Sequence, residues 1–211
     1  IWFNCRAEEF LFDGDRCCGV KTNLGQVDCD SVLANINPDI IYGKMMPKEL
    51  VPEREKKLSA ARDRKMGGRM FTAYFCCDKS AEELGIKDYS VFIAPDSDSD
   101  KQYEAAQNFK SGFCIINCLN EIIPDCTPEG TCQLFLTTMT FGDVMKDIKP
   151  QDYKKFKTKV AKDMIETCEK ALNISITPYI EEIEIALPPT FSRYLNTPLG
   201  TPYGYRLEKW D

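Results

Sequence analysis

Alternating apolar and polar positions at the start of the chain predict a small β-meander. Three strand-like runs cover residues 8–12, 16–21 and 26–33. They are separated by Asp13-Gly14-Asp15 and by Asn23-Leu24-Gly25. Short, Gly-containing separators of this kind are typical of hairpin turns, so the three runs are expected to pair in order.

Helical spacing replaces this alternation after the meander. Asn37-Pro38 is expected to open a short helical piece that ends near Met46-Pro47. A charged stretch over residues 51–65 again has helical spacing, and Gly67-Gly68 is expected to end it.

The middle of the chain alternates strand candidates with short helices. Strands are predicted over 69–77, 89–94, 112–119 and 131–139, and helices over 80–83 and 99–108. The acidic run over residues 96–100 lacks the Gly and the terminal Glu of an EF-hand loop, so it is interpreted as a solvated turn that ends in a helix cap.

The clearest helix is predicted over residues 150–172, because apolar side chains recur there at spacings of three or four. Its other face is rich in lysine with acids between them, and is interpreted as a solvated helix face. Residues 179–187 then alternate Ile and Glu as a last strand, which Pro188-Pro189 is expected to end.

These elements predict an α+β fold, in which a mostly antiparallel mixed sheet is covered by helices and preceded by the meander. The chain has no internal repeat, low-complexity linker or block of like charge that would mark a boundary between independent domains.

Charge and composition exclude several classes of protein. The net charge of −6 argues against a nucleic-acid partner, because such proteins usually carry a basic excess. The longest uncharged stretches, 111–120 and 131–142, are shorter than the roughly 20 residues that span a bilayer, so no transmembrane segment is expected. The opening residues resemble no signal peptide, which favours a cytoplasmic location. The absence of histidine excludes Ser-His-Asp triads and Cys-His dyads.

Eleven cysteines are interpreted as reduced, mostly packed thiols, because their number is odd and no secretory signal is visible. A metal or cluster site is a second hypothesis, with four thiols in Cys114-x3-Cys118 and Cys126-x5-Cys132. The spacing supports it poorly, because zinc and iron–sulfur sites favour C-x2-C and because Cys114 and Cys118 would lie about 13 Å apart along a strand.

Three stretches together resemble the FAD-dependent phytoene desaturase, carotenoid isomerase and retinol saturase-like oxidoreductases. They are GVKTNLGQVDCDSVLANINPDIIYGKMMP (19–47), MGGRMFTAYFCCDKSAEELGI (66–86) and IEEIEIALPPTFSRYLNTPLGTPYGY (180–205). Their order and spacing match the family over nearly the whole chain. Neither the family's G-x-G-x-x-G flavin fingerprint nor its C-terminal glycine-rich segment occurs here, so the chain is expected to be an internal segment of a larger flavoenzyme.

The resemblance implies a functional division of the chain. Residues 1–46 would form the meander and a crossing segment toward a missing FAD domain, 47–187 the substrate-binding domain, and 188–211 a return segment. FAD is implied for the full-length protein, an enzyme, and none for this segment, which alone would be inactive and colourless. The residues expected near the flavin in the whole protein are Asn35, Asn37, Gly200, Tyr203 and Gly204.

The resemblance also implies an apolar, isoprenoid or carotenoid-like substrate that is desaturated, saturated or isomerised. One wall of its cavity would be the sheet, with Phe71, Ala73, Phe75, Phe113, Ile115 and Phe135 as candidate lining residues. These six could equally be plain core residues, because alternation assigns faces to a strand without saying which face is wet.

Two further expectations concern partners. The alternative function is a self-contained lipid-binding or partner-binding module without a cofactor. A segment separated from its flavin domain is also expected to self-associate through apolar residues that lose their cover. These residues are Val32, Leu33, Ile36, Leu187, Phe191, Tyr194 and Tyr203.

Overall fold

The computed structural model describes residues 1–61, 66–107 and 112–206. The chain divides into two compact units, Ile1–Lys65 and Met66–Asp211, each of which is described by itself. The division after Lys65 follows no compositional linker. The functional boundaries at residues 46 and 187 were implied by the family resemblance, whereas the boundary at Lys65 reflects how compactly the chain folds. The functional division therefore stays a prediction.

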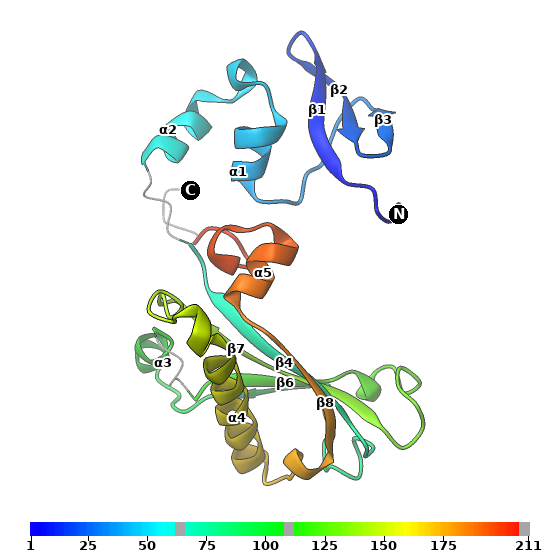
Figure 1. The fold of residues 1–211 in the computed structure, drawn as a ribbon, viewed down its shortest axis with the longest axis vertical. Coiled ribbons are helices and arrows are strands. Elements are labelled where there is room, and N and C mark those ends of the chain that lie inside the picture. Colours follow the sequence, from blue (N-terminus) through cyan, green and yellow to red (C-terminus); the bar gives the residue numbers. More distant parts are fainter. Residues whose placement is uncertain (62–65, 108–111, 207–211) are drawn as a thin grey trace. The chain divides into compact units, whose positions relative to one another are not determined.

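The first unit contains the expected three-stranded meander (Figure 1), whose antiparallel strands are β1 (Ala7–Asp13), β2 (Arg16–Thr22) and β3 (Gly25–Asp28). The predicted turns are confirmed: Gly14 has φ +62° and Gly25 has φ +131°, which glycine adopts without a steric penalty. The predicted third strand was too long. It ends at Asp28, and after the Cys29 N–H donates to the Cys18 carbonyl the chain leaves the sheet.

Short helical elements complete the first unit. They are α1 (Pro38–Ile40), the π-helical turn η1 (Ile41–Met45), the 3-10 turn η2 (Lys48–Leu50) and α2 (Glu53–Ala61). Asn37 caps α1, with its Oδ1 accepting the Asp39 N–H at 2.8 Å. Residues 62–65 of the helix predicted over 51–65 lie outside the described part of the chain.

The second unit is built on a five-stranded sheet in the order β5-β6-β7-β4-β8, in which each described neighbouring pair is antiparallel. Its strands are β4 (Arg69–Cys77), β5 (Ser90–Ile93), β6 (Cys114–Cys118), β7 (Cys132–Thr140) and β8 (Ile180–Ala186). The prediction of an α+β fold with a mostly antiparallel sheet and a leading meander is confirmed.

One face of this sheet is covered by α4 (Tyr153–Leu172), the long helix predicted from its apolar stripe (Figure 1). The helix contributes Val160, Met164 and Cys168 to the core, and the sheet contributes alternate residues of β4, β6 and β7. Asn173 in the left-handed conformation ends the helix, as the sequence indicates.

One prediction about a short helix was wrong. Residues 80–83 form a single turn: the Ser80–Glu83 capping pair is present, but Gly85, at φ +77°, stops the helix after one turn. The expected end of β8 at Pro188 and Pro189 is confirmed. The same two residues also begin helix α5 (Pro188–Leu195), because a proline needs no N–H bond in the first turn of a helix.

The remaining elements are short. Asp98 caps α3 (Ser99–Ala105) by accepting the Asp100 N–H, which confirms the interpretation of the acidic run as a capped turn; residue 108 of the predicted helix is outside the described range. Four 3-10 turns lie in the connections, η3 (Leu119–Glu121), η4 (Pro150–Asp152), η5 (Thr177–Tyr179) and η6 (Pro198–Gly200).

Candidate functional site

The sheet of the second unit has two chemically different faces, which are called here the helix-covered face and the open face. Cross-strand pairing decides which residues share a face: Tyr74 of β4 lies opposite Phe135 of β7, and Phe75 lies opposite Leu134. Even-numbered residues of β4 therefore share a face with odd-numbered residues of β7 and β6.

The helix-covered face is a packed core. Phe71, Ala73 and Phe75 of β4 are 0%, 0% and 2% exposed, and the Phe71 ring packs edge-on against Phe156 of α4 with the centroids 6.2 Å apart. These three residues, expected as possible cavity wall, are thus core residues, the alternative that the alternation left open. Side chains held by α4 cannot also face a ligand on the open side.

The open face carries partly exposed apolar and aromatic side chains. Its centre is the Tyr74–Phe135 ring pair, with centroids 5.9 Å apart and planes inclined by 34°. Tyr74 is 37% and Phe92 68% exposed, and Ile115 lies between β5 and β7 opposite Phe92. Of the six expected wall residues, Ile115 and Phe135 are therefore on this face.

The other members of the open face are polar or flexible. The hydroxyls of Thr72 and Thr137 hydrogen-bond to each other at 3.0 Å across β4 and β7. Met70, near the first residue of β4, lies opposite Met139 of β7. The Glu184 position of β8 borders the face beside Tyr74. The face can hold an apolar ligand by contact, since Met and aromatic side chains adapt to irregular apolar shapes.

Phe113, the sixth expected wall residue, lies just before β6 and is half-buried. Its carbonyl oxygen accepts a hydrogen bond from the Thr138 hydroxyl at 2.6 Å, so the backbone at this position is fixed. Tyr74 and Phe92 were missed by the sequence reasoning. The sequence shows only that side chains alternate between two faces along each strand. Which face of the sheet they share with residues of other strands follows once the strand register is known.

The residues expected near a flavin fall into both compact units. In the first unit Asn35 is exposed, whereas Asn37 is 6% exposed and its Nδ2 has no hydrogen-bond partner in the described residues. A buried amide donor without a partner fits a ligand that offers an acceptor oxygen, as a flavin nucleotide does.

In the second unit the expected flavin residues have different surroundings. Gly200, at φ +69°, is buried, and a Cβ there would lie 1.9 Å from the Pro188 carbonyl oxygen, so packing against α5 already explains this glycine. Gly204 has φ +72° with open space around it, and Tyr203 is 74% exposed. The last two leave room for a ligand, whereas Gly200 does not require one.

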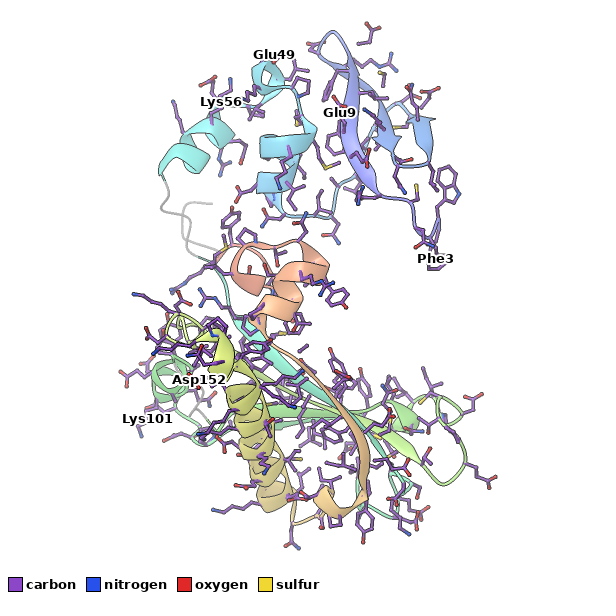
Figure 2. The ribbon with its side chains drawn as sticks, viewed as in Figure 1. Phe3, Glu9, Glu49, Lys56, Lys101 and Asp152 are labelled. Atoms are coloured by element: carbon purple, nitrogen blue, oxygen red, sulfur yellow. The ribbon has the colours of Figure 1, made fainter. Side chains whose placement is uncertain are left out.

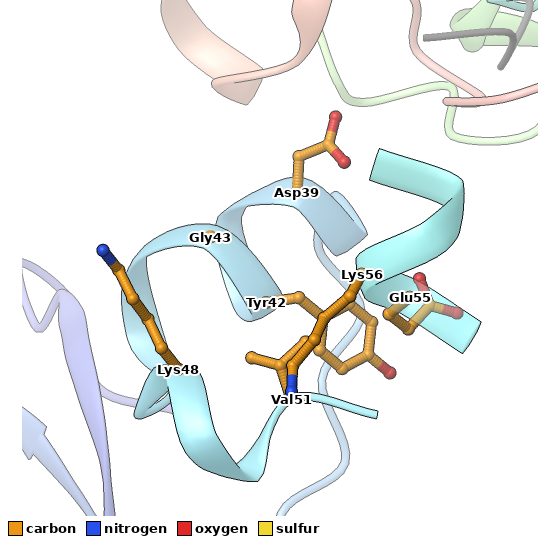
Figure 3. A pocket seen from close by; sticks show the side chains of 7 residues that line it. All are labelled: Asp39, Tyr42, Gly43, Lys48, Val51, Glu55 and Lys56. Atoms are coloured by element: carbon orange, nitrogen blue, oxygen red, sulfur yellow. The ribbon is translucent and has the colours of Figure 1, made fainter. Parts of the chain in front are cut away.

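A separate pocket lies within the first unit and has a volume of about 390 Å³ (Figure 3). Tyr42 and Val51 give it apolar surface, and the Lys56 ammonium at its side pairs with Glu53 at 2.8 Å. Two acids and two lysines line the pocket, so its charge favours neither an anionic nor a cationic ligand. Sequence reasoning missed this pocket, because its residues come mainly from four short elements that share no motif.

The described residues contain no group of three or more His, Cys, Asp or Glu side chains placed to hold a metal ion. Cys114 and Cys118 are buried on the helix-covered face, while Cys126 is exposed in the loop before β7. Cys118 contacts Cys132, and this hydrogen bond together with burial raises the Cys118 pKa. Three of the four thiols of the metal hypothesis are thus packed in the core, away from the fourth.

Thiol reactivity should follow this burial. Burial raises the pKa of Cys114 to about 11 and that of Cys168 to about 12, so these two thiols hold little thiolate at pH 8, whereas Cys76 and Cys126 are exposed to reagents. We expect Ellman's reagent to modify Cys76 and Cys126 at least about 100-fold faster than the two buried thiols. Mass spectrometry of labelled peptides would measure the rates, and equal rates before denaturation would contradict the packing.

Comparison with other proteins gives structural likenesses. No family model matches the chain, and no curated protein matches it. Similar solved structures include an oxidoreductase from Methanosarcina mazei (10% identity, TM-score 0.48) and RAB GDI from Plasmodium falciparum (18%, 0.41). A third is the FAD-complexed glycerol-3-phosphate dehydrogenase from Bacillus halodurans (10%, 0.35). Each alignment covers 87% of this chain.

This chain spans about a third of the length of those structures, with 37%, 31% and 30% of them covered. Two of the three are oxidoreductases by name, and one holds FAD. At these identities, and with each TM-score below 0.5, the likenesses carry no argument about the chemistry of this chain.

No helix in the described residues is long and apolar enough to cross a membrane.

Proposed function

We propose that this chain is the substrate-binding portion of an FAD-dependent oxidoreductase, with the open face of its sheet as one wall of the substrate site. The observation that carries the proposal is the Tyr74–Phe135 pair, which exposes apolar surface on a sheet whose opposite face is buried in the core with α4. Apolar residues kept at the surface of a rigid sheet favour a ligand or a second layer against them.

The proposed substrate is apolar and isoprenoid-like, and it would be desaturated, saturated or isomerised. Support comes from the resemblance of the three sequence stretches and from the Met70, Met139 and Ile115 side chains that extend the aromatic centre. In this proposal the residues of this face bind and orient the substrate, and a bound flavin would supply the redox chemistry.

FAD would be held by residues of the whole protein, to which this chain contributes a part. The unpartnered Nδ2 of Asn37 in the first unit and the open space beside the Gly204 Cα in the second are each compatible with that role. We expect the purified chain alone to be colourless and the whole protein to bind FAD. A stoichiometric flavin absorbance in the chain alone, or a gene without a dinucleotide-binding fingerprint upstream of Ile1, would contradict this part of the proposal.

Substrate binding can be tested on the chain itself with retinol as a fluorescent isoprenoid probe. Phe135→Ala should weaken retinol binding about tenfold, because an aromatic contact in an apolar site contributes about that factor. Phe3→Ala is the matched control, since Phe3 is an aromatic residue of the first unit, 82% exposed (Figure 2). Equal affinities of the two variants would overturn the assignment of the open face.

The alternative, a self-contained lipid-binding or partner-binding module without cofactor, shares the open face but needs no flavin. Retinol binding that depends on Phe135, in a whole protein that does not bind FAD, would favour it.

Self-association also remains a proposal. Leu33, Tyr194 and Tyr203 are 100%, 77% and 74% exposed and could take part, whereas Leu187 is fully buried, so expecting it to lose its cover was wrong.

A further inference from the structure

The outer face of α4 carries a row of exposed lysines, called here the lysine face and made of Lys154, Lys155, Lys159 and Lys162. They lie in the first half of a 20-residue helix and line a shallow groove along its surface. Figure 2 labels Asp152 just before the first turn of this helix. The opposite face of α4 is packed on the sheet, so the lysine face is presented to the outside of this unit.

The acids that alternate with these lysines in the sequence neutralise only part of the lysine face, because two of them, Asp163 and Glu166, line the same groove as the four lysines. Asp163 pairs with Lys159 at 2.5 Å. Glu169 instead accepts the backbone N–H groups of Ile176 and Thr177 at 2.7 Å each. Within the described chain, Lys154, Lys155 and Lys162 have no ion-pair partner. The face is mixed and exposed, as the sequence indicates, and its four lysines outnumber the two acids of the groove.

This arrangement is unfavourable for the helix itself. Lys155 and Lys159 are four residues apart, and Lys159 and Lys162 are three apart, so like charges lie side by side on the helix surface. Cations near the start of a helix also oppose its dipole, and the first turn of α4 contains no acid. In a protein with a net charge of −6, a positive cluster that costs helix stability points to a role in binding.

We propose that the lysine face docks this protein on an anionic phospholipid membrane surface. Charge complementarity identifies the partner of the lysine face as anionic. The composition of α4 indicates that this partner is a lipid surface and not a protein. The helix has six lysines and no arginine, and its aromatic residues Tyr153 and Phe156 pack toward the core. Protein interfaces are depleted in lysine and enriched in arginine and aromatic anchors. Exposed lysines without such anchors instead match attraction to anionic headgroups, which needs no specific geometry.

The test is cosedimentation of the chain with phosphatidylcholine vesicles that contain or lack phosphatidylserine. Each lysine near an anionic surface contributes about fivefold to partitioning, so the triple variant K154Q/K155Q/K162Q should bind roughly 100-fold more weakly. The control K44Q/K48Q/K87Q removes three exposed lysines that lie outside α4 and should bind nearly as wild type. Added salt should release the wild-type protein, because screening weakens surface electrostatics.

Thermal unfolding distinguishes lost binding from lost folding. Because the lysines disfavour the helix, K154Q/K155Q/K162Q should melt at or above the wild-type temperature while losing vesicle binding. The proposal is overturned if vesicles with and without phosphatidylserine bind equally, or if both triple variants lose binding equally. It is also overturned if the chain ignores the vesicles and binds polyglutamate or a DNA oligonucleotide through the same lysines.

Discussion

Replacing Leu134 with alanine is expected to lower the free energy of unfolding by about 2–5 kcal/mol, because it leaves a cavity in a close-packed core. Leu134 is 0% exposed on the helix-covered face, opposite Phe75 and beside Cys118 of the next strand. Urea unfolding followed by circular dichroism would measure the change. The loss should appear in the transition that unfolds α4, which packs on this face.

The control is the adjacent residue of the same strand. Phe135→Ala removes a larger side chain, yet it should cost only about 1 kcal/mol of unfolding free energy, because Phe135 is partly exposed on the open face. The same variant is expected to lose retinol affinity, and Leu134→Ala to keep it wherever the protein remains folded. A reversed order of the two stabilities would show that the faces of the sheet have been assigned the wrong way round.

Gly200→Ala should be as damaging as the loss of a core side chain, with an expected cost of about 3 kcal/mol or more in unfolding free energy. Two effects add at this position. A φ of +69° disfavours any residue with a Cβ, and the new methyl group would lie 1.9 Å from the Pro188 carbonyl oxygen at the start of α5. The backbone of either α5 or η6 must therefore move.

Gly204→Ala separates the two effects. Gly204 has a similar φ of +72°, but no atom lies within 4 Å of the added Cβ. It should cost about 1 kcal/mol, the backbone contribution alone. Measured by the same urea titration, equal costs at both positions would show that Gly200 and Pro188 are not in close contact.

The expected flavin role of Gly200 can be separated from this structural role. If the whole protein binds FAD, Gly204→Ala should weaken flavin binding without a large loss of stability, whereas Gly200→Ala should lower both together. The difference in unfolding free energy between the two variants does not depend on a flavin. It therefore tests the packing at Gly200 even if the whole protein does not bind FAD.

Local chemistry in the sequence determined most of the elements. Period-two alternation located β4, β6, β7 and β8, the turn glycines fixed the meander, and the apolar stripe together with Asn173 bounded α4. These signals could be read in advance because they act between residues close in the chain. The early end of β3 depends on where its pairing with β2 stops, whereas the single turn at residues 80–83 follows from the nearby Gly85.

Tertiary structure decided the two proposed surfaces. Alternation divides each strand into two sets, but the antiparallel register that places Tyr74 opposite Phe135, and Phe75 opposite Leu134, arises between residues about 60 positions apart. Likewise, the sequence shows lysines and acids mixed along α4, while folding draws Glu169 to the backbone after the helix and leaves four lysines with two acids along one groove. The sequence by itself determined the α+β elements and the apolar positions. Packing chose which face α4 covers and which side chains remain exposed, because burial is a property of the assembled sheet and helix and not of either element alone.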